Sequence, residues 1–525
     1  EHPSYRTVRA QAGPIFSIVD LLPQMASANR EPPLPPCSIY VHDVHAAMQF
    51  HLPEEDVPGA WEHTQYATEL WVQRALAQHP WRVSRPELAD VIFLAANFSL
   101  FCVASMYKQR ALWSKMAGDP FLHSATTGNI SRQIKFVTLQ YQGCKAPWIG
   151  SRAKPTSDTI FLKEYVTGDR RKAVVSPFVV SRPLWLVGSP AARLQASPLQ
   201  PPVVAWASRK LIFFAGHVPK PYIRPTRYLL WRQTRQDPRV TVISSTLSCQ
   251  IGTFAKCDWP ESTLRAQNNT FWLTHCHSLC GKKSTCMSSA RRKPAANMQG
   301  FLRACARMHA PRLLRKANFT EELPDMIRDT RRIPHAEYLS FAMSHKFCLI
   351  APGDWISTHK VTEAMALGGA GGCIPVFVAP GSSQQDIEAA VPGMLPYTRW
   401  HDYCQTAYFV SEYDAKLNFT GILDRLALIS EAEARAKLQA LRHVRDAFVF
   451  RAESTMDMPS APHFILGEAC AAAQLRRTEP TNATGTPLGK RLVHQVRVDL
   501  RTCMLTSPLP RSIGSDHRHR SKPSL

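Results

Sequence analysis

The residues most able to do chemistry lie in the stretch 345–380, HKFCLIAPGDWISTHKVTEAMALGGAGGCIPVFVAP. A hydrophobic strand is predicted to end in a Pro-Gly-Asp turn, after which Ser357 and Thr358 open a helix. Helix N-termini beyond the carboxyl ends of parallel strands offer free N–H groups and a positive dipole, so a phosphate group would bind there. Lys360 would then supply a compensating charge, and Glu363 could accept hydrogen bonds from ribose hydroxyls. A capping Ser-Thr pair with a solvated Lys and Glu is the alternative interpretation.

The elements that must position these residues follow a strand–helix–strand pattern in two parts of the chain. Hydrophobic runs at 37–44 and 86–95 flank a helical pattern at 66–79. The pattern restarts with a strand at 209–218 and continues with a basic helix and a strand at 239–244. Further strands are predicted at 134–143, 173–180 and 373–380, and further helices at 357–368 and 430–450. Short connections between such elements are typical of parallel sheets, so we predict an α/β fold.

Composition shifts divide the chain into segments. We predict a Pro-rich stem or linker at 1–36, an N-terminal lobe at 37–200, a C-terminal lobe at 205–450 with a Cys-rich insertion at about 246–300, and a basic, poorly ordered tail at 451–525. The linker between the lobes is SPLQPPVV, at 197–204. The chain has 525 residues, enough for more than one core.

The net charge of +23 favours acidic partners such as phosphate esters, anionic polysaccharide, anionic lipid or nucleic acid. A hydrophobic content of 45% excludes wholesale disorder. No apolar run reaches the roughly 18 residues of a membrane helix, and the chain begins without a basic-then-apolar signal segment. We therefore expect either a soluble protein or an N-terminal anchor that lies outside this sequence.

Several linked motifs resemble the exostosin-like glycosyltransferases, glycosyltransferase family 47, of the plant and algal type. In the 345–380 stretch the matches are KFCL at 346–349, PGD at 352–354, the Ser-x-x-Lys-x-x-Glu-Ala helix at 357–364 and GCIPV at 372–376. Elsewhere the matching segments are 38–44, YATE at 66–69, RPELAD at 85–90, 213–231 and LPY at 395–397. Three features depart from the family: extra residues at 367–371, Lys360 where Arg is commoner, and the absence from 112–144 of the Gly-Arg-Asp-His-Phe and His-Asp-x-Gly stretches.

This resemblance implies a GT-B-like architecture, with two Rossmann-like lobes and a cleft between them. It implies transfer of a sugar, with inversion, from a nucleotide-sugar donor (a UDP-sugar) to a polysaccharide or glycoprotein glycan, with no metal or other cofactor and no nucleic acid. It also implies a Golgi type II membrane protein whose anchor is absent from this sequence. The implied donor-binding residues are Gly216, His217, Arg224, Arg227, Ser357, Thr358, Lys360 and Glu363. Gly216 would allow close backbone approach, and the basic side chains would neutralise the diphosphate, although Arg224 and Arg227 could equally be surface charges.

An inverting transfer also needs a base within hydrogen-bond reach of the acceptor hydroxyl. The candidates are His42, Asp43 and Glu69, and structural roles are an open alternative for them. Two other functions also stay open: an inactive relative that binds polysaccharide, and a nucleic-acid-binding protein, which only the charge suggests.

The fourteen cysteines allow disulfides, metal binding or simple burial. The cluster at 275–286 could form a zinc site, disulfides or an unpaired insertion. Cys348 and Cys373 are expected as core residues. Six Asn-x-Ser/Thr sequons, which favour the secretory pathway, begin at Asn97, Asn129, Asn268, Asn318, Asn418 and Asn482.

Overall fold

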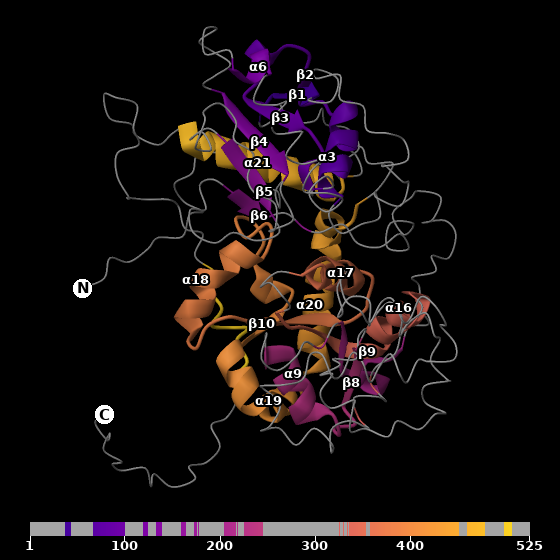
Figure 1. Ribbon diagram of the computed structural model, residues 1–525. Helices are drawn as coiled ribbons and strands as arrows, with labels where there is room; N and C mark the ends of the chain where they lie inside the picture. The colour runs from indigo at the N-terminus through magenta and orange to yellow at the C-terminus, as the bar shows by residue number, and fades with distance from the viewer. Residues whose placement is uncertain are drawn as a thin grey trace, which may run out of the picture.

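The computed structural model describes residues 37–43, 67–99, 119–123, 133–138, 159–163, 173–175, 177, 204–216, 218, 225–244, 325, 329, 333, 335–352, 358–450, 459–477 and 498–506. These residues form two parallel β-sheets with helices around them (Figure 1), which confirms the predicted α/β fold. The Cys-rich insertion at 246–300, the linker up to residue 203 and the stem at 1–36 lie outside the described residues.

The first sheet has the strand order β2-β1-β3-β4-β5-β6. Its strands are β1 (Ile39–Asp43), β2 (Arg82–Val83), β3 (Val91–Ala95), β4 (Ile134–Thr138), β5 (Thr159–Lys163) and β6 (Ala173–Val175). Helix α3 (Thr68–Ala77) connects β1 to β2, the 3-10 turn η4 (Pro86–Leu88) precedes β3, and α6 (Pro120–His123) follows β3. Every residue of β3 is buried, which explains why this strand is a continuous apolar run in the sequence.

The second sheet has the order β11-β10-β9-β7-β8. Its strands are β7 (Lys210–Gly216), β8 (Val240–Ser244), β9 (His345–Ile350), β10 (Ile374–Ala379) and β11 (Tyr408–Ser411). The helices are α9 (Pro225–Thr234), α16 (His335–Ser344), α17 (Lys360–Gly369), α18 (Gln384–Met394), α19 (Glu412–Ala427) and α20 (Glu431–Val444), and short 3-10 turns are η7 (Trp206–Ser208), η8 (Tyr403–Gln405) and η9 (Arg445–Phe448). Helices α16, α17 and α20 pack in one group, whereas α9 and α19 pack together in another.

Both sheets have the doubly wound order 2-1-3-4-5 when their strands are numbered in chain order, with one more strand added at the edge of the first. In this order the chain changes direction between the first and third strands, and ligands of such sheets bind beyond the carboxyl ends of these two strands. The topological switch points are therefore the β1/β3 edge in the first sheet and the β7/β9 edge in the second.

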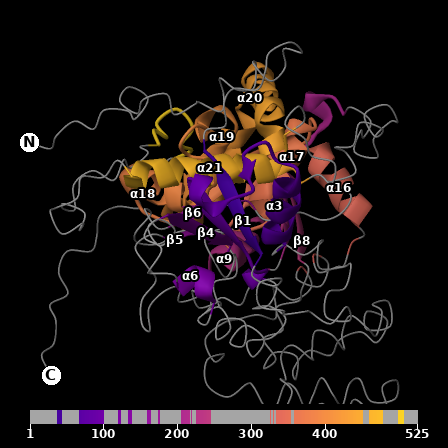
Figure 2. The same cartoon turned by 90° about the horizontal axis from the view of Figure 1, so that it is seen from above.

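A helix near the C-terminus, α21 (Ala461–Arg477), follows the second sheet but packs on the first, against α3, β5 and β6 (Figures 1 and 2). Its apolar side chains are buried, and a disulfide joins Cys470 to Cys37, just before β1. The prediction of a poorly ordered tail is therefore wrong for 461–477, because this segment carries an apolar helix face that the first lobe covers.

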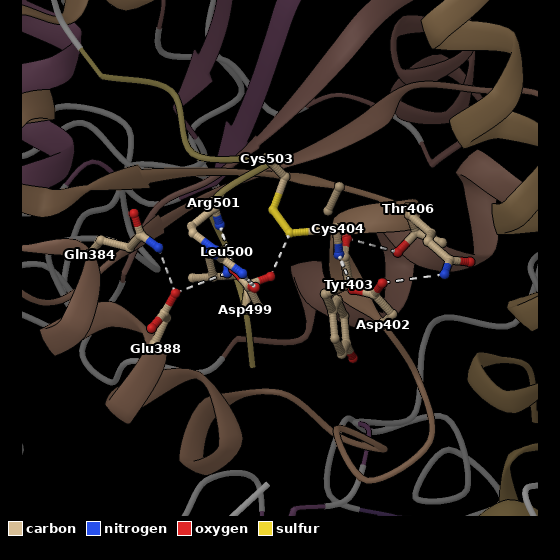
Figure 3. Close-up of a disulfide and its surroundings, with 12 residues drawn as sticks. Gln384, Glu388, Asp402, Tyr403, Cys404, Thr406, Asp499, Leu500, Arg501 and Cys503 are labelled. Atoms are coloured by element: carbon tan, nitrogen blue, oxygen red, sulfur yellow. Dashed lines mark hydrogen bonds and ion pairs between the residues drawn. A yellow bond between two sulfur atoms is a disulfide. The ribbon is translucent and has the colours of Figure 1, made fainter. Parts of the chain in front are cut away.

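The segment 498–506 is also ordered against the second sheet (Figure 3). Cys503 forms a disulfide with Cys404, whose Cα lies 5.2 Å away, and the amide of Leu505 donates to the carbonyl of Phe409 in β11 at 2.7 Å. This segment therefore extends the sheet beyond β11, and the tail prediction is wrong here as well.

Cys348 and Cys373 are buried, as expected for core residues, but they are also bonded to each other. Cys348 lies in β9 and Cys373 directly precedes the neighbouring strand β10, with a Cα–Cα distance of 5.4 Å. The expectation of simple core cysteines is corrected accordingly, because the two residues lie on neighbouring parallel segments with their Cα atoms close enough for a disulfide. None of the helices in the described part of the chain has the length and hydrophobicity of a membrane-spanning segment.

Candidate functional site

The switch point of the second sheet is bridged by an arginine. Arg227 lies in the first turn of α9, and its Nε and Nη2 donate to the carbonyl oxygen of Ala351, just beyond β9, at 3.1 and 2.9 Å. The guanidinium also lies over the ring of Phe214 in β7, 5.5 Å from its centroid. A buried cation is therefore fixed at the point where a doubly wound sheet binds its ligand.

Gly216, the last residue of β7, lies beside this arginine. A Cβ at position 216 would lie 3.7 Å from Nη1 of Arg227 and 3.3 Å from the ring of Phe214. A side chain here would press on the ring of Phe214, whereas Nη1 of Arg227 lies at an ordinary van der Waals distance. Position 216 therefore favours a small residue mainly because of this ring.

A second charged group lies at the start of α17. The Nζ of Lys360 donates to Oε2 of Glu363 at 2.6 Å, and the hydroxyl of Tyr338 in α16 donates to the same oxygen at 2.6 Å. The ammonium of Lys360 also lies over the ring of Tyr338, 4.2 Å from its centroid. Glu363 is only 5% exposed, so the alternative of a solvated Lys and Glu at a helix start does not describe these residues.

The surroundings of Glu363 and His359 determine which of these two side chains is charged at neutral pH. Burial alone would raise the pKa of Glu363, but the charge of Lys360, the charge that His359 carries at acid pH and the hydrogen bonds from Lys360 and Tyr338 lower it to about 2. Burial lowers the pKa of His359 to about 4, and the cations Lys360 and Arg227 add to this effect against the opposing pull of Glu363. Glu363 is thus ionised and His359 neutral, and the charge of Arg227 is close enough to influence the start of α17.

Of the predicted donor-binding residues, the structure places Gly216 beside Arg227 and Lys360 beside Glu363, and the charge of Arg227 lowers the pKa of His359 next to that second pair. Thr358 precedes them, and its hydroxyl is 3.5 Å from the amide of Lys360, which is a weak capping contact. His217, Arg224 and Ser357 lie outside the described residues.

Two members of this site, His359 and Tyr338, were not predicted from the sequence. His359 directly precedes Lys360 in the same motif, so it could have been predicted as a member of the site from its position in the sequence. Tyr338 belongs to a different helix, and only the packing of α16 against α17 shows its role.

The switch point of the first sheet holds a histidine–aspartate pair. His42, near the end of β1, has its Nε2 2.6 Å from Oδ2 of Asp119, and both side chains are buried. The ring of Phe121 stacks on that of His42 with a centroid distance of 4.3 Å, and the amide of Phe121 donates to Oδ1 of Asp119 at 2.8 Å. Within the described part of the chain, no hydrogen bond to Nδ1 of His42 is formed. Asp119, in the connection after β3, was missed because its contact with β1 arises only in the folded sheet.

The other two candidate bases have different surroundings. Asp43 is exposed at the end of β1. Glu69 in α3 is fully buried and accepts a hydrogen bond from the amide of Ala96, just after β3, at 3.2 Å. Burial raises the pKa of Glu69 to about 8 despite the lowering effect of the backbone at 96–99, so this carboxyl is protonated at neutral pH. A protonated, enclosed carboxyl fits the anchoring of the loop after β3 better than proton abstraction.

No group of three or more potential metal ligands occurs among the described residues. A search against protein-family models finds no match for this chain. A search of curated proteins finds no significant relative either.

Proposed function

We propose that this protein is a glycosyltransferase of the exostosin-like type with a GT-B architecture, using a nucleotide-sugar donor such as a UDP-sugar. The proposal assigns donor binding to the second lobe and acceptor activation to the first, and transfer with inversion to a polysaccharide or a glycoprotein glycan. Two doubly wound sheets, each with a switch point that carries polar side chains, support this division of roles.

The observation that carries the proposal is that Arg227 lies at the β7/β9 switch point, while the Lys360–Glu363 pair lies at the start of α17, the helix that follows β9. A diphosphate at this edge would meet a fixed guanidinium, an ammonium and the N-terminus of α17, which together offset the charge that develops on the leaving nucleotide. Glu363 would accept hydrogen bonds from ribose hydroxyls with Oε1, because Lys360 and Tyr338 both bond Oε2. Lys360, only three residues from Glu363, could swing from the carboxylate to a phosphate oxygen with little displacement.

In the first lobe we assign the base to His42. The hydrogen bond between its Nε2 and Asp119 would leave Nδ1 to take the proton of the acceptor hydroxyl while the oxygen attacks the anomeric carbon. Asp119 would then be a positioning residue that stabilises the protonated imidazole. Asp43, at the exposed end of the same strand, is the alternative base.

The three disulfides among the described residues support a secretory-pathway compartment, because such bonds persist in oxidising environments. A Golgi location with an anchor preceding residue 1 remains part of the proposal.

The test is calorimetric titration of the protein with UDP, followed by assays of UDP-sugar turnover. We expect Lys360→Ala to weaken UDP binding by about 10- to 100-fold, the usual range for a hydrogen bond to a charged group. The matched control is Lys416→Ala, since Lys416 forms a similar helical ion pair with Glu412 in α19. His42→Ala should retain UDP binding but lose turnover.

Equal UDP affinity for Lys360→Ala and the wild type would refute the proposed donor site. Polysaccharide binding by a protein that binds no UDP would instead support the inactive relative.

A further inference from the structure

We infer that Asn418 carries an N-linked glycan and that Asn97 does not, although both begin an Asn-x-Ser/Thr sequon. These are the two sequons that fall within the described residues. Their local structures differ in three properties that decide whether the folded protein can accommodate a glycan: backbone conformation, exposure of the sequon and freedom of the side-chain nitrogen.

Asn418 lies at a break within helix α19. Its backbone angles, φ −153° and ψ 77°, are extended rather than helical. Gln233 of α9 fixes this break, because its side-chain amide donates to the carbonyl of Lys416 at 2.9 Å and its oxygen accepts from the amide of Phe419 at 2.7 Å. The sequon is thus presented in an ordered, non-helical conformation on a helix at the outer edge of the second lobe (Figure 1).

The oxygen and the nitrogen of the Asn418 side chain have different roles. Its Oδ1 accepts a hydrogen bond from the amide of Gly421 at 3.0 Å and so caps the second half of α19. A glycan is attached to Nδ2, which this cap does not use, so the cap and the modification are compatible. Thr420, the hydroxyl residue of the sequon, is exposed.

The surface next to Asn418 is unusually apolar for an exposed helix. Four large hydrophobic side chains are exposed in the described part of the chain, and three of them belong to α19 or its C-cap: Tyr413, Leu417 and Leu428. Tyr413, five residues before Asn418, is 58% exposed, and Leu417, the residue directly before Asn418, is 51% exposed. A sugar chain at Asn418 would shield these side chains from water and from other proteins.

The sequon at Asn97 has the opposite character. Asn97 has a left-handed φ of 51°, and its Oδ1 is buried. Phe98 and Ser99, the other two residues of the sequon, are both 0% exposed. A glycan at this position would have to displace the loop that Glu69 holds after β3.

The modification is a group transfer from a lipid diphosphate-linked oligosaccharide. A bond forms between Nδ2 of Asn418 and the anomeric carbon of the first sugar, while the bond between that carbon and the phosphate oxygen breaks. Nδ2 loses one proton, and the lipid diphosphate leaves with the electron pair.

The experiment is site-specific mass spectrometry of the full chain, secreted from a eukaryotic host behind a secretory leader. Trypsin releases peptide 417–425, LNFTGILDR, and a peptide N-glycosidase acting in heavy-oxygen water converts a glycosylated Asn to labelled Asp. We expect label at Asn418 and none at Asn97. Thr420→Ala should abolish the label and Thr420→Ser should keep it, and neither change touches the cap or a buried contact.

An unlabelled peptide 417–425 from the folded, secreted wild type would overturn the inference, as would label at Asn97. The result is independent of UDP binding, so failure here leaves the proposed activity untouched.

Discussion

Replacing Glu363 by Gln tests whether the charged group at the start of α17 has the electrostatics that its geometry indicates. The substitution keeps the size of the side chain and an oxygen that can accept from Tyr338 and Lys360, but it removes the negative charge. Lys360 would then lose its only carboxylate partner within the described residues. Because both groups are largely buried, this loss is not recovered by water.

The magnitude follows from the pKa of Glu363, which is about 2 in the folded protein against an ordinary value of 4.5. At about 1.36 kcal/mol for each pKa unit, this difference contributes about 3 kcal/mol to the free energy of unfolding at neutral pH. The contribution is fully present above pH 4.5 and is lost as the pH falls through 2. At pH 3 about 1 kcal/mol remains, since the unfolded carboxyl is already protonated while the folded one is still largely ionised.

The assay is urea denaturation of the wild type and Glu363→Gln at pH 7 and pH 3. We expect Glu363→Gln to be less stable by about 3 kcal/mol at pH 7 and by about 1 kcal/mol at pH 3. The control is Glu431→Gln, which breaks the exposed pair with Arg435 on α20 and should cost at most about 0.5 kcal/mol. A loss of stability of equal size at both pH values would refute the electrostatic reasoning and indicate a packing defect instead.

Two further substitutions test other parts of the structure. Glu69→Gln should stabilise the protein by as much as about 3 kcal/mol at pH 7 and have almost no effect at pH 4. The pKa of Glu69 is raised from 4.5 to about 8 on folding, so the stability that its protonated form contributes below pH 4.5 is lost progressively as the pH rises from 4.5 to 8. Urea denaturation measures this, and destabilisation at pH 7 would contradict it. Replacing Cys404 and Cys503 by Ser should lower the free energy of unfolding by roughly 2–5 kcal/mol because the bond closes a segment of 99 residues. Hydrogen exchange should then show faster exchange at the amides of Phe409 and Leu505, and unchanged protection of both would contradict a role for the disulfide in holding 498–506 on β11.

The strands of both sheets could be predicted where they are buried on both faces. The runs at 86–95 and 209–218 contain β3 and β7, and the amphipathic pattern at 430–450 contains α20. Strand β5 was not predicted, because its five residues lie among turn-forming residues and carry little periodic signal. Helix α21 was not predicted, because its many alanines give little contrast between an apolar and a polar face in the sequence.

The candidate site could be predicted in part, for a similar reason. Lys360 and Glu363 share one face of one helix, so their spacing of three residues predicts their contact. Contacts between separate elements carried no such signal: Asp119 is 77 residues from His42 in the chain, and Tyr338 is 25 residues from Glu363. No sequence spacing predicts either contact, because only the folded arrangement of separate elements brings the partners together.

Strand order explains why these distant residues meet where they do. In each sheet the first and third strands are neighbours. The connections that follow these two strands run to opposite faces of the sheet, so the residues that begin them lie close together at its carboxyl edge. Arg227 reaches Ala351 across this edge in the second sheet, and His42 reaches Asp119 across it in the first. The same topology thus places a cation at one edge and a histidine–aspartate pair at the other, although the two sheets share no motif. Under the proposed function, the cation would stabilise a leaving diphosphate at one sheet and the histidine–aspartate pair would take up a proton at the other.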